Sequence, residues 1–167
     1  MNNPIETFFA VWDREAEKTT LMLTSLEGAD YNFRPDPGGR SLGELAWHLA
    51  EGDAYISFAI ARGKFETGVK PPNIQRPLTI AELAPGYQRI HQEARKRLTA
   101  LTMADLDKEM QFFDGSVQPV SQLLWDMLVL HAVHHRGQLS VLARLAGATI
   151  PGMFGPAREQ SAQAAKT

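Results

Sequence analysis

The chain has 167 residues, of which 44% are hydrophobic and 22% charged, and its formal net charge is −2. These values are typical of one globular domain. We expect a single domain over residues 1–167, with its core at about 4–147 and a tail at 148–167. The small net charge gives no electrostatic reason to expect nucleic acid or an anionic membrane as a partner. The absence of cysteine excludes disulfides, thiolate metal ligands and a protein thiol nucleophile.

The N-terminal stretch MNNPIETFFAVWDREAEK does not resemble a targeting segment. It is acidic and amphipathic, and it lacks the basic start, apolar segment and cleavage site of a signal peptide. No apolar run reaches the length of about 18 residues that a membrane-spanning helix needs. We therefore expect a cytoplasmic protein.

The first predicted helix begins at Asn3, which can cap it, and Pro4, which suits a first helical position. Its apolar residues recur at helical spacing as far as Leu26, and Gly28 follows where a left-handed cap is often needed. The next run, NFRPDPGGR, contains too many prolines and glycines for a regular element.

Two further helices are predicted from capping boxes, in which a Ser or Thr precedes a Glu by three residues. One box, Ser41-x-x-Glu44, begins a helix that ends near Gly63. The other, Thr79-x-x-Glu82, begins a helix that continues to about residue 101. The segment GVKPPNIQRP between the two helices is predicted to be a loop.

After the third helix, TMADLDKE predicts a short helical turn, and MQFFDGSVQPV carries an Asp-Gly pair typical of a small hairpin. The fourth helix is expected from about Pro119 to Ala146, stopping at Gly147, and the last residues of the chain are expected to fray. Four amphipathic helices with almost no strand predict an all-α four-helix bundle.

Histidines interrupt the apolar stripe of the fourth helix. At helical spacing the stripe continues through His131, His135 and Gln138. Residues four apart on a helix differ by about 40° around the axis and about 6 Å along it, so both imidazoles can reach one metal ion. His134 is an alternative ligand through its three-residue spacing from His131. The stripe otherwise consists of Leu124, Met127, Leu128, Leu139, Leu142 and Leu145.

A third ligand must come from another helix, and spacing alone leaves two candidates open. His48 lies on the buried side of the second helix, and His91 adjoins the buried side of the third. Near His48, three acidic residues are possible acceptors or bases, although solvated surface positions are the commoner role for such residues; they are Glu44, Glu51 and Asp53.

Several enzyme classes lack support in the sequence. Ala132 stands where an HExxH metalloprotease has its glutamate. No nucleophile-elbow serine motif, phosphate-binding loop or dinucleotide-binding glycine pattern is present.

Three stretches, SLGELAWHLAEGD, HAVHHRGQLSVLARLAG and IPGMFGPA, together with the RPDPGGR loop, resemble the DinB-like, or YfiT-like, metalloenzyme superfamily. This is the damage-inducible bundle family, not the similarly named polymerase. The resemblance implies an up-down four-helix bundle, a homodimer, and a divalent metal held by His48, His131 and His135, with His134 as a neighbour.

The superfamily also implies a chemistry. Its known activities include metal-dependent transfer or isomerisation with a low-molecular-weight thiol, which here must be a separate cosubstrate because the chain has no cysteine. We expect Zn²⁺ as the ion, with Ni, Fe and Mn as alternatives, and a metal-activated thiol or water as nucleophile. Gln138 would orient a substrate and Arg136 would pair with a carboxylate of the protein or of the substrate. The alternative function is a stress-related protein that binds a metal or small ligand without catalysis.

Overall fold

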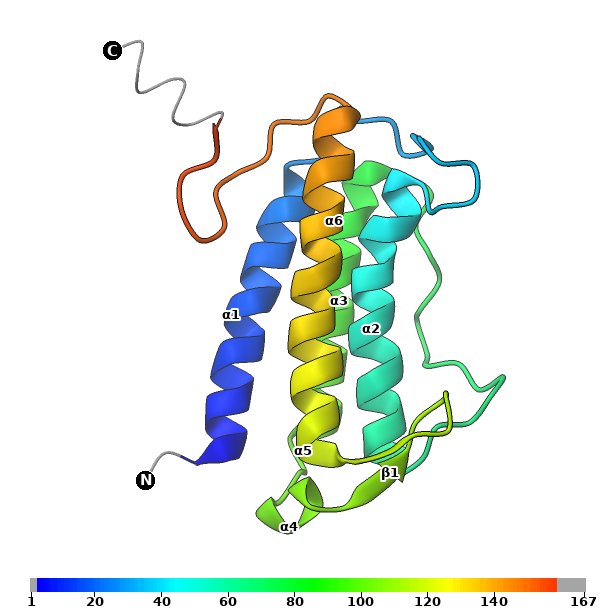
Figure 1. The fold of residues 1–167 in the computed structure, drawn as a ribbon, viewed down its shortest axis with the longest axis vertical. Helices are drawn as coiled ribbons and strands as arrows, with labels where there is room; N and C mark the ends of the chain where they lie inside the picture. Colours follow the sequence, from blue (N-terminus) through cyan, green and yellow to red (C-terminus); the bar gives the residue numbers. More distant parts are fainter. Residues whose placement is uncertain (1–2, 159–167) are drawn as a thin grey trace.

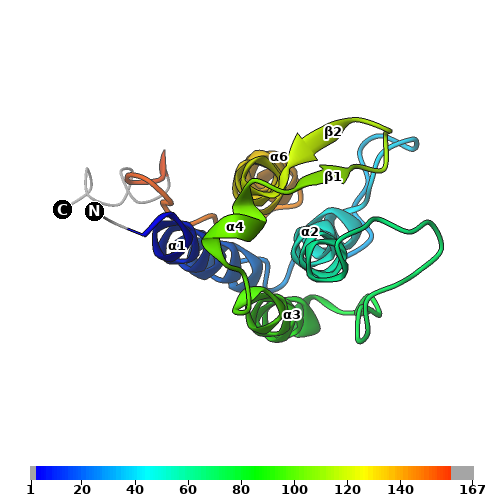
Figure 2. The same ribbon diagram turned by 90° about the horizontal axis from the view of Figure 1, so that it is seen from below.

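The structure is a computed structural model that describes residues 3–158, and it is a four-helix bundle (Figure 1). Seen from below, the four long helices surround a common centre (Figure 2). The predicted all-α bundle is confirmed. Among the described residues, no helix combines the length and apolar content needed to cross a bilayer. The long helices are Pro4–Thr24 (α1), Leu42–Arg62 (α2), Leu83–Leu98 (α3) and a composite helix of Val120–Leu123 (α5), Leu124–Leu130 (η2) and His131–Leu145 (α6).

The connection from α2 to α3 sets the direction of the helices. Residues 63–79 lead to a short 3₁₀ helix, Ile80–Glu82 (η1), at the start of α3. At about 3.3 Å per extended residue, this segment can return along α2, which is about 31 Å long. In Figure 1 it does return, so α2 and α3 run in the same direction, while α1 and α6 run opposite to them. Helix direction therefore alternates along the chain except between α2 and α3. The strict up-down order that the resemblance implies is wrong at this connection, because residues 63–79 are long enough to return along α2 before α3 begins.

The predicted starts of the first two helices are confirmed. The Asn3 side chain accepts a hydrogen bond from the N–H of Ile5, with Pro4 in the first helical position. Ser41 and Glu44 form the expected reciprocal capping box, and α2 ends at Gly63 in the left-handed conformation.

The predicted capping box at the third helix is wrong. Thr79 makes no side-chain hydrogen bond to the backbone of the following turn, and its hydroxyl donates instead to the Glu82 carboxylate at 2.7 Å. The first turn is 3₁₀, and the α-helix begins only at Leu83. The Thr79-x-x-Glu82 motif therefore marks the start of the helical segment, although it does not form the reciprocal hydrogen bonds of a capping box.

A short hairpin closes the lower end of the bundle, as the Asp-Gly pair predicts. After a four-residue helix, Met103–Leu106 (α4), strand Glu109–Gln111 (β1) pairs antiparallel with Val117–Pro119 (β2). Gly115 in the turn has φ +89°, a conformation that favours glycine. Figure 2 shows the hairpin across the end of the α2 and α6 pair.

The last helix contains a feature that periodicity did not predict. Leu124–Leu130 is a π-helix, whose i→i+5 hydrogen bonds turn the chain by a smaller angle per residue than an α-helix. The buried face of the following α6 is therefore displaced by one residue, from the predicted 131, 135 and 138 to 132, 136 and 139. The prediction that Leu145 lies on the buried stripe is wrong for the same reason, since its side chain is 62% exposed.

Two apolar clusters form the core, and a layer of buried polar side chains lies between them. One cluster includes Met22, Trp47 and Leu83, and the other includes Phe8 and Leu98. Every buried side-chain nitrogen and oxygen of the described residues has a hydrogen-bond partner. The polar layer comes from all four helices and includes Glu15, Thr19, Asp53, His91 and Arg136.

Candidate metal centre

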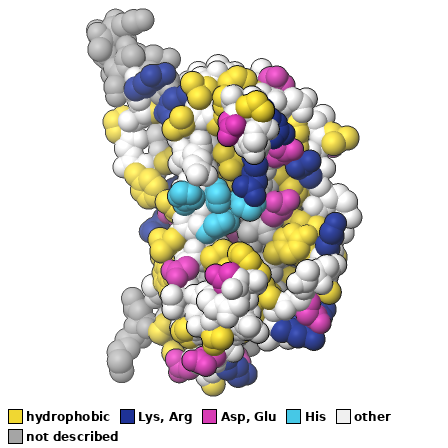
Figure 3. Space-filling model, turned by 45° about the vertical axis from the view of Figure 1, so that its right-hand side comes forward, with side chains coloured by type: hydrophobic (Ala, Val, Ile, Leu, Met, Phe, Trp, Pro, Cys, Tyr) yellow, Lys and Arg dark blue, Asp and Glu magenta, His cyan; other side chains and the backbone are white. Residues whose placement is uncertain are grey.

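Three histidines from two antiparallel helices converge on one point. His48 of α2 meets His131 and His135 of α6, and one ring nitrogen from each lies within 4.8 Å of the other two. The ring centroid of His48 is 5.2 Å from that of His131 and 4.6 Å from that of His135. In Figure 3 the histidine side chains form one continuous patch that reaches the surface. This geometry suits a tetrahedral ion with three protein ligands and an open fourth position.

The π-helix explains why these side chains reach both the bundle and the solvent. Because the buried face of α6 is displaced to Ala132 and Arg136, His131 and His135 lie beside the core rather than in its centre. Both are half-buried, at the groove between α6 and α2. A metal ion held by these histidines would therefore be accessible to small molecules that enter the groove.

Hydrogen bonds from neighbouring residues orient two of the three rings. Nδ1 of His48 lies 3.1 Å from Oε2 of Glu51, and Nδ1 of His135 lies 2.7 Å from Oε1 of Gln138. Both oxygens accept, which in a neutral ring places the proton on Nδ1 and the lone pair on Nε2. Metal-binding histidines in proteins commonly donate their other N–H in this way. The donor set therefore fits a divalent metal ion.

The third ring approaches its neighbours closely. Nε2 of His131 is 3.0 Å from Nε2 of His135. On its other side, the ring lies over Gly52 of α2, where an added Cβ would be 3.5 Å from Nδ1 of His131. A Cβ would fit at this distance, whereas a longer side chain at position 52 would meet the His131 ring.

Burial and neighbouring positive charge keep two of these imidazoles neutral. Desolvation, followed by the proximity of His135 and His48, lowers the pKa of His131 to about 4. Desolvation also lowers the pKa of His135, against the raising effect of its hydrogen bond to Gln138. Neutral imidazole is the form that binds metal, so the ring nitrogens of this pair are available at neutral pH.

His91 takes part in a different cluster. Its Nδ1 lies 2.8 Å from the Asp53 carboxylate and its Nε2 lies 3.2 Å from that of Asp13. Asp53 also accepts from the indole N–H of Trp12 at 3.1 Å. Burial would lower the pKa of His91, but hydrogen bonds and charge from the two aspartates raise it overall. Of the two candidates for the third ligand, the structure therefore groups His48, and not His91, with His131 and His135.

The other predicted neighbours are divided between the site and the rest of the fold. Of the three acidic candidates near His48, only Glu51 contacts its ring, because Asp53 faces His91 and Glu44 caps α2 and pairs with Arg34. His134 is exposed, with its ring 5.0 Å from that of His135. Gln138 contacts His135 and is also exposed.

Arg136 lies away from the three histidines. It is 3% exposed, and its guanidinium forms an ion pair with the Glu15 carboxylate and donates to the Glu15 carbonyl at 2.8 Å. A further hydrogen bond reaches the Thr19 hydroxyl at 3.3 Å. Of the two partners predicted for Arg136, the structure shows a carboxylate of the protein itself.

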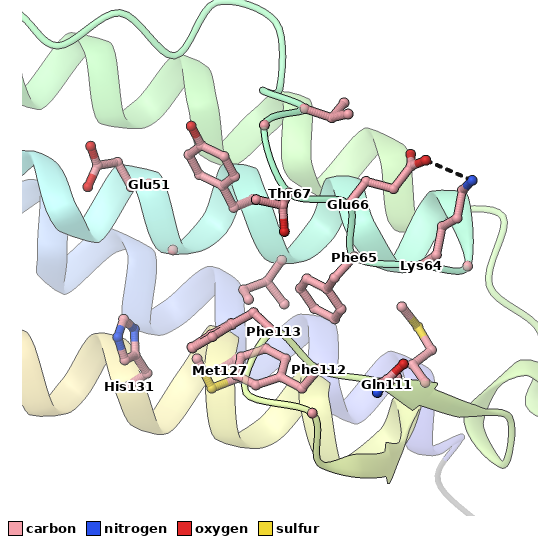
Figure 4. A pocket seen from close by; sticks show the side chains of 18 of the residues that line it. Glu51, Lys64, Phe65, Glu66, Thr67, Gln111, Phe112, Phe113, Met127 and His131 are labelled. Atoms are coloured by element: carbon pink, nitrogen blue, oxygen red, sulfur yellow. Dashed lines mark ion pairs between the residues drawn. The ribbon is translucent and has the colours of Figure 1, made fainter.

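A cavity of about 1070 Å³ adjoins His48 and His131. Its wall away from the histidines is aromatic, with the ring centroids of Phe65 and Phe112 4.8 Å apart and those of Phe112 and Phe113 4.0 Å apart (Figure 4). These side chains come from the segment after α2 and from the hairpin. The cavity is large enough for a drug-sized molecule, and its composition favours an apolar one.

Sequence reasoning missed the contributions that only tertiary packing brings to the site. The aromatic wall comes from segments predicted as loop and hairpin. Arg40 also escaped notice, although its charge contributes to the lowered pKa values of both His131 and His135. Gly52 could have been recognised in the sequence as a neighbour of the site, because it follows His48 by four residues and so lies on the same helix face.

Comparison with known proteins agrees with the fold. A crystal structure of a DinB-like protein from Bacillus cereus ATCC 10987 is 33% identical, with a TM-score of 0.71 over 89% of this chain and 96% of that one. A member of the same family from Exiguobacterium sibiricum 255-15, 21% identical with a TM-score of 0.69, covers 92% of this chain and 99% of its own, and supports the fold alone.

Sequence similarity covers almost the whole chain. The uncharacterized protein YrdA of Bacillus subtilis (strain 168) is 30% identical over 166 residues, or 98% of this chain and 95% of that protein. The sequence model of the DinB family matches residues 1–166. The chain therefore belongs to the DinB family.

Proposed function

We propose that this protein is a metal-dependent enzyme that transfers a low-molecular-weight thiol to an apolar electrophile. The observation that carries the proposal is the convergence of His48, His131 and His135 at the edge of a large cavity with an aromatic wall. A divalent ion held by these imidazoles, with Zn²⁺ as our first expectation, would lower the pKa of a bound thiol and so supply a nucleophile at neutral pH.

The protein's own residues have three tasks in this proposal. Glu51 and Gln138 hold the rings of His48 and His135 with Nε2 free. The aromatic side chains of the cavity receive the electrophile and exclude water from it. In the transfer, a sulfur–carbon bond forms, the leaving group departs with the electron pair of its bond to carbon, and the thiol proton is lost to solvent.

The first test is the metal content of protein purified without a metal-affinity tag. We expect about one equivalent of a divalent ion in the wild type, and background amounts in His48→Ala and His131→Ala. His134→Ala is the matched control, because this residue lies beside the site without belonging to the group of three. Metal retained in the first two variants would contradict the ligand assignment.

The second test is turnover with a small thiol and a halogenated nitroaromatic electrophile. We expect release of halide and formation of the thioether, at a rate that falls to that of the solution reaction in His131→Ala. Tight binding of metal and thiol without product for any electrophile would favour the alternative, a binding protein without catalysis.

A further inference from the structure

A second, smaller cavity lies on the opposite side of the three histidines from the aromatic one. It has a volume of about 470 Å³ and is lined by Arg40, Leu45, Gln138, Val141, Leu142 and Leu145. On α2, Leu45 comes one turn before His48, whereas Ile56 of the aromatic cavity comes two turns after it. On the antiparallel α6, Gln138 comes one turn after His135, and Met127 of the aromatic cavity precedes His131. Along α2 and α6, the histidines therefore lie between the two cavities.

The charges of the two cavities differ. The aromatic cavity is lined by the acidic residues Glu51, Glu66 and Glu109 and by one lysine, Lys64, which pairs with Glu66 at 2.8 Å. Among residues 3–158, the lining of the smaller cavity includes no acidic residue, and Arg40 is its single charged residue. An anionic group entering the groove is therefore favoured in the smaller cavity.

Arg40 is available to such a group. Its side chain is exposed, and it has no ion pair or hydrogen bond within residues 3–158. Other arginines near the start of α2 are already paired, since Arg34 and Arg76 both contact Glu44. Arg40 is also close enough for its charge to lower the pKa values of His131 and His135. Within the described part of the chain, it is thus a cation without a protein partner beside the candidate metal centre.

Gln138 adds a polar group to the same cavity. Its Oε1 accepts the hydrogen bond from His135, while its amide nitrogen makes no hydrogen bond within the described part of the chain. One helical turn, about 5 Å, separates Gln138 from His135 along α6. A molecule with sulfur at the histidines and a carboxylate two or three bonds farther would therefore extend toward the Gln138 amide, in the cavity that Arg40 also lines.

We propose that the smaller cavity binds the thiol cosubstrate through a carboxylate held by Arg40 and Gln138, and that the aromatic cavity binds the electrophile. This inference rests on the proposed function and adds the chemical class of the thiol. An arginine guanidinium with an amide N–H matches a carboxylate better than a neutral hydroxyl or an ammonium group. The two substrates would then approach the histidines from opposite ends of the groove.

The test compares thiols of similar length that differ in charge. Protein loaded with Co²⁺ is titrated with 3-mercaptopropionate, 2-mercaptoethanol and cysteamine, and binding is followed by the change in the cobalt absorption spectrum. Three proteins are compared: the wild type, Arg40→Gln, and Lys96→Gln as a control. Lys96 is an exposed residue of α3 that lines neither cavity, so its substitution changes the net charge equally.

We expect the ratio of the Kd for 2-mercaptoethanol to that for 3-mercaptopropionate to be about fivefold higher in the wild type than in Arg40→Gln, as for a partly exposed ion pair of about 1 kcal/mol. Lys96→Gln should keep the wild-type ratio. Of the three thiols, cysteamine should have the highest Kd for the wild type. At about 1 M salt, where the screening length is about 3 Å, the wild-type preference should shrink.

The two hypotheses fail in different ways. If the thiols bind but Arg40→Gln leaves the ratio unchanged, the carboxylate subsite is overturned while the proposed function stands. If Co²⁺ does not bind, or if no thiol changes the spectrum, the proposed function is overturned together with the subsite.

Discussion

Nε2 of His131 and Nε2 of His135 face each other at 3.0 Å across one turn of α6. Without metal, one of these nitrogens must carry a proton and the other must accept it. A metal ion would instead require the lone pairs of both. Protons and a metal ion therefore compete for these two nitrogens. Metal binding depends on the groups that hold the proton at Nδ1, which are Glu51 beside His48 and Gln138 beside His135.

The first prediction concerns the residues that orient the rings. Glu51→Ala and Gln138→Ala remove the acceptors for Nδ1 of His48 and His135. We expect each change to weaken metal binding about 10- to 100-fold, because outer hydrogen bonds set the tautomer and basicity of metal-binding imidazoles. Competition with a chromogenic chelator measures the affinity.

The control for this prediction is Glu51→Gln, which keeps an oxygen acceptor but removes the charge. It should weaken metal binding less than Glu51→Ala. Equal affinity for the wild type and both alanine variants would show that these hydrogen bonds do not influence the site.

The second prediction is that the stability of the metal-free protein depends on pH. Folding lowers the pKa of His131 to about 4 and also lowers that of His135, whereas unfolded histidine titrates near pH 6.5. The unfolded state therefore binds more protons between these values. The stability contributed by the neutral imidazoles is fully present above about pH 6.5 and is lost as the pH falls toward 4.

The measurement is urea unfolding of the metal-free protein between pH 7 and pH 4.5, with His131→Gln beside the wild type. The variant should lose less stability on acidification. His91 acts in the opposite direction, because its raised pKa gives stability that is present below pH 6.5 and lost as the pH rises through the folded-state pKa. An acid dependence unchanged by His131→Gln would contradict the assignment.

The third prediction decides the role of Arg136. Its guanidinium is buried against Glu15 and Thr19, so Arg136→Met leaves the Glu15 carboxylate without its arginine partner. We expect a loss of about 3–5 kcal/mol in the free energy of unfolding. Metal stoichiometry of the folded protein should remain that of the wild type, because Arg136 does not contact the three histidines.

The double variant Glu15→Leu with Arg136→Met provides the control, since replacing both members of a buried pair by apolar residues can restore stability. We expect it to be more stable than Arg136→Met alone in thermal or urea unfolding. A variant Arg136→Met with wild-type stability but no thiol binding would instead place this residue in the substrate site.

The fourth prediction concerns Gly52. A Cβ at this position would make ordinary contact with Nδ1 of His131 at 3.5 Å, and alanine is favoured over glycine in a helix interior. Gly52→Ala should therefore raise the stability by about 0.5–1 kcal/mol and keep the metal. Gly52→Leu should displace the His131 ring and weaken metal binding, which calorimetric titration with Zn²⁺ measures. Undiminished metal affinity in Gly52→Leu would show that the close approach of α2 is unimportant.

The sequence by itself determined the four long helices, the caps that start the first two of them, and the four-residue spacing of His131 and His135. Local signals such as the Asn3 cap, the Ser41–Glu44 box and the left-handed Gly63 depend on neighbouring residues only, and they act within one turn of helix. The four-residue spacing of His131 and His135 likewise needs no tertiary information, because helix geometry alone brings both rings to one side.

Tertiary structure decided everything that depends on contacts between helices. Spacing left His48 and His91 equivalent, and only the packing of α2 against α6 separates them, since His91 is paired with Asp53 and Asp13. Periodicity also placed the histidines on the buried stripe, because it assumes about 100° per residue throughout a helix. The π-helix at Leu124–Leu130 breaks that assumption and displaces the buried face by one residue. The same displacement buries Arg136 and leaves His131 and His135 at the groove, between two cavities whose walls come from segments distant in the sequence.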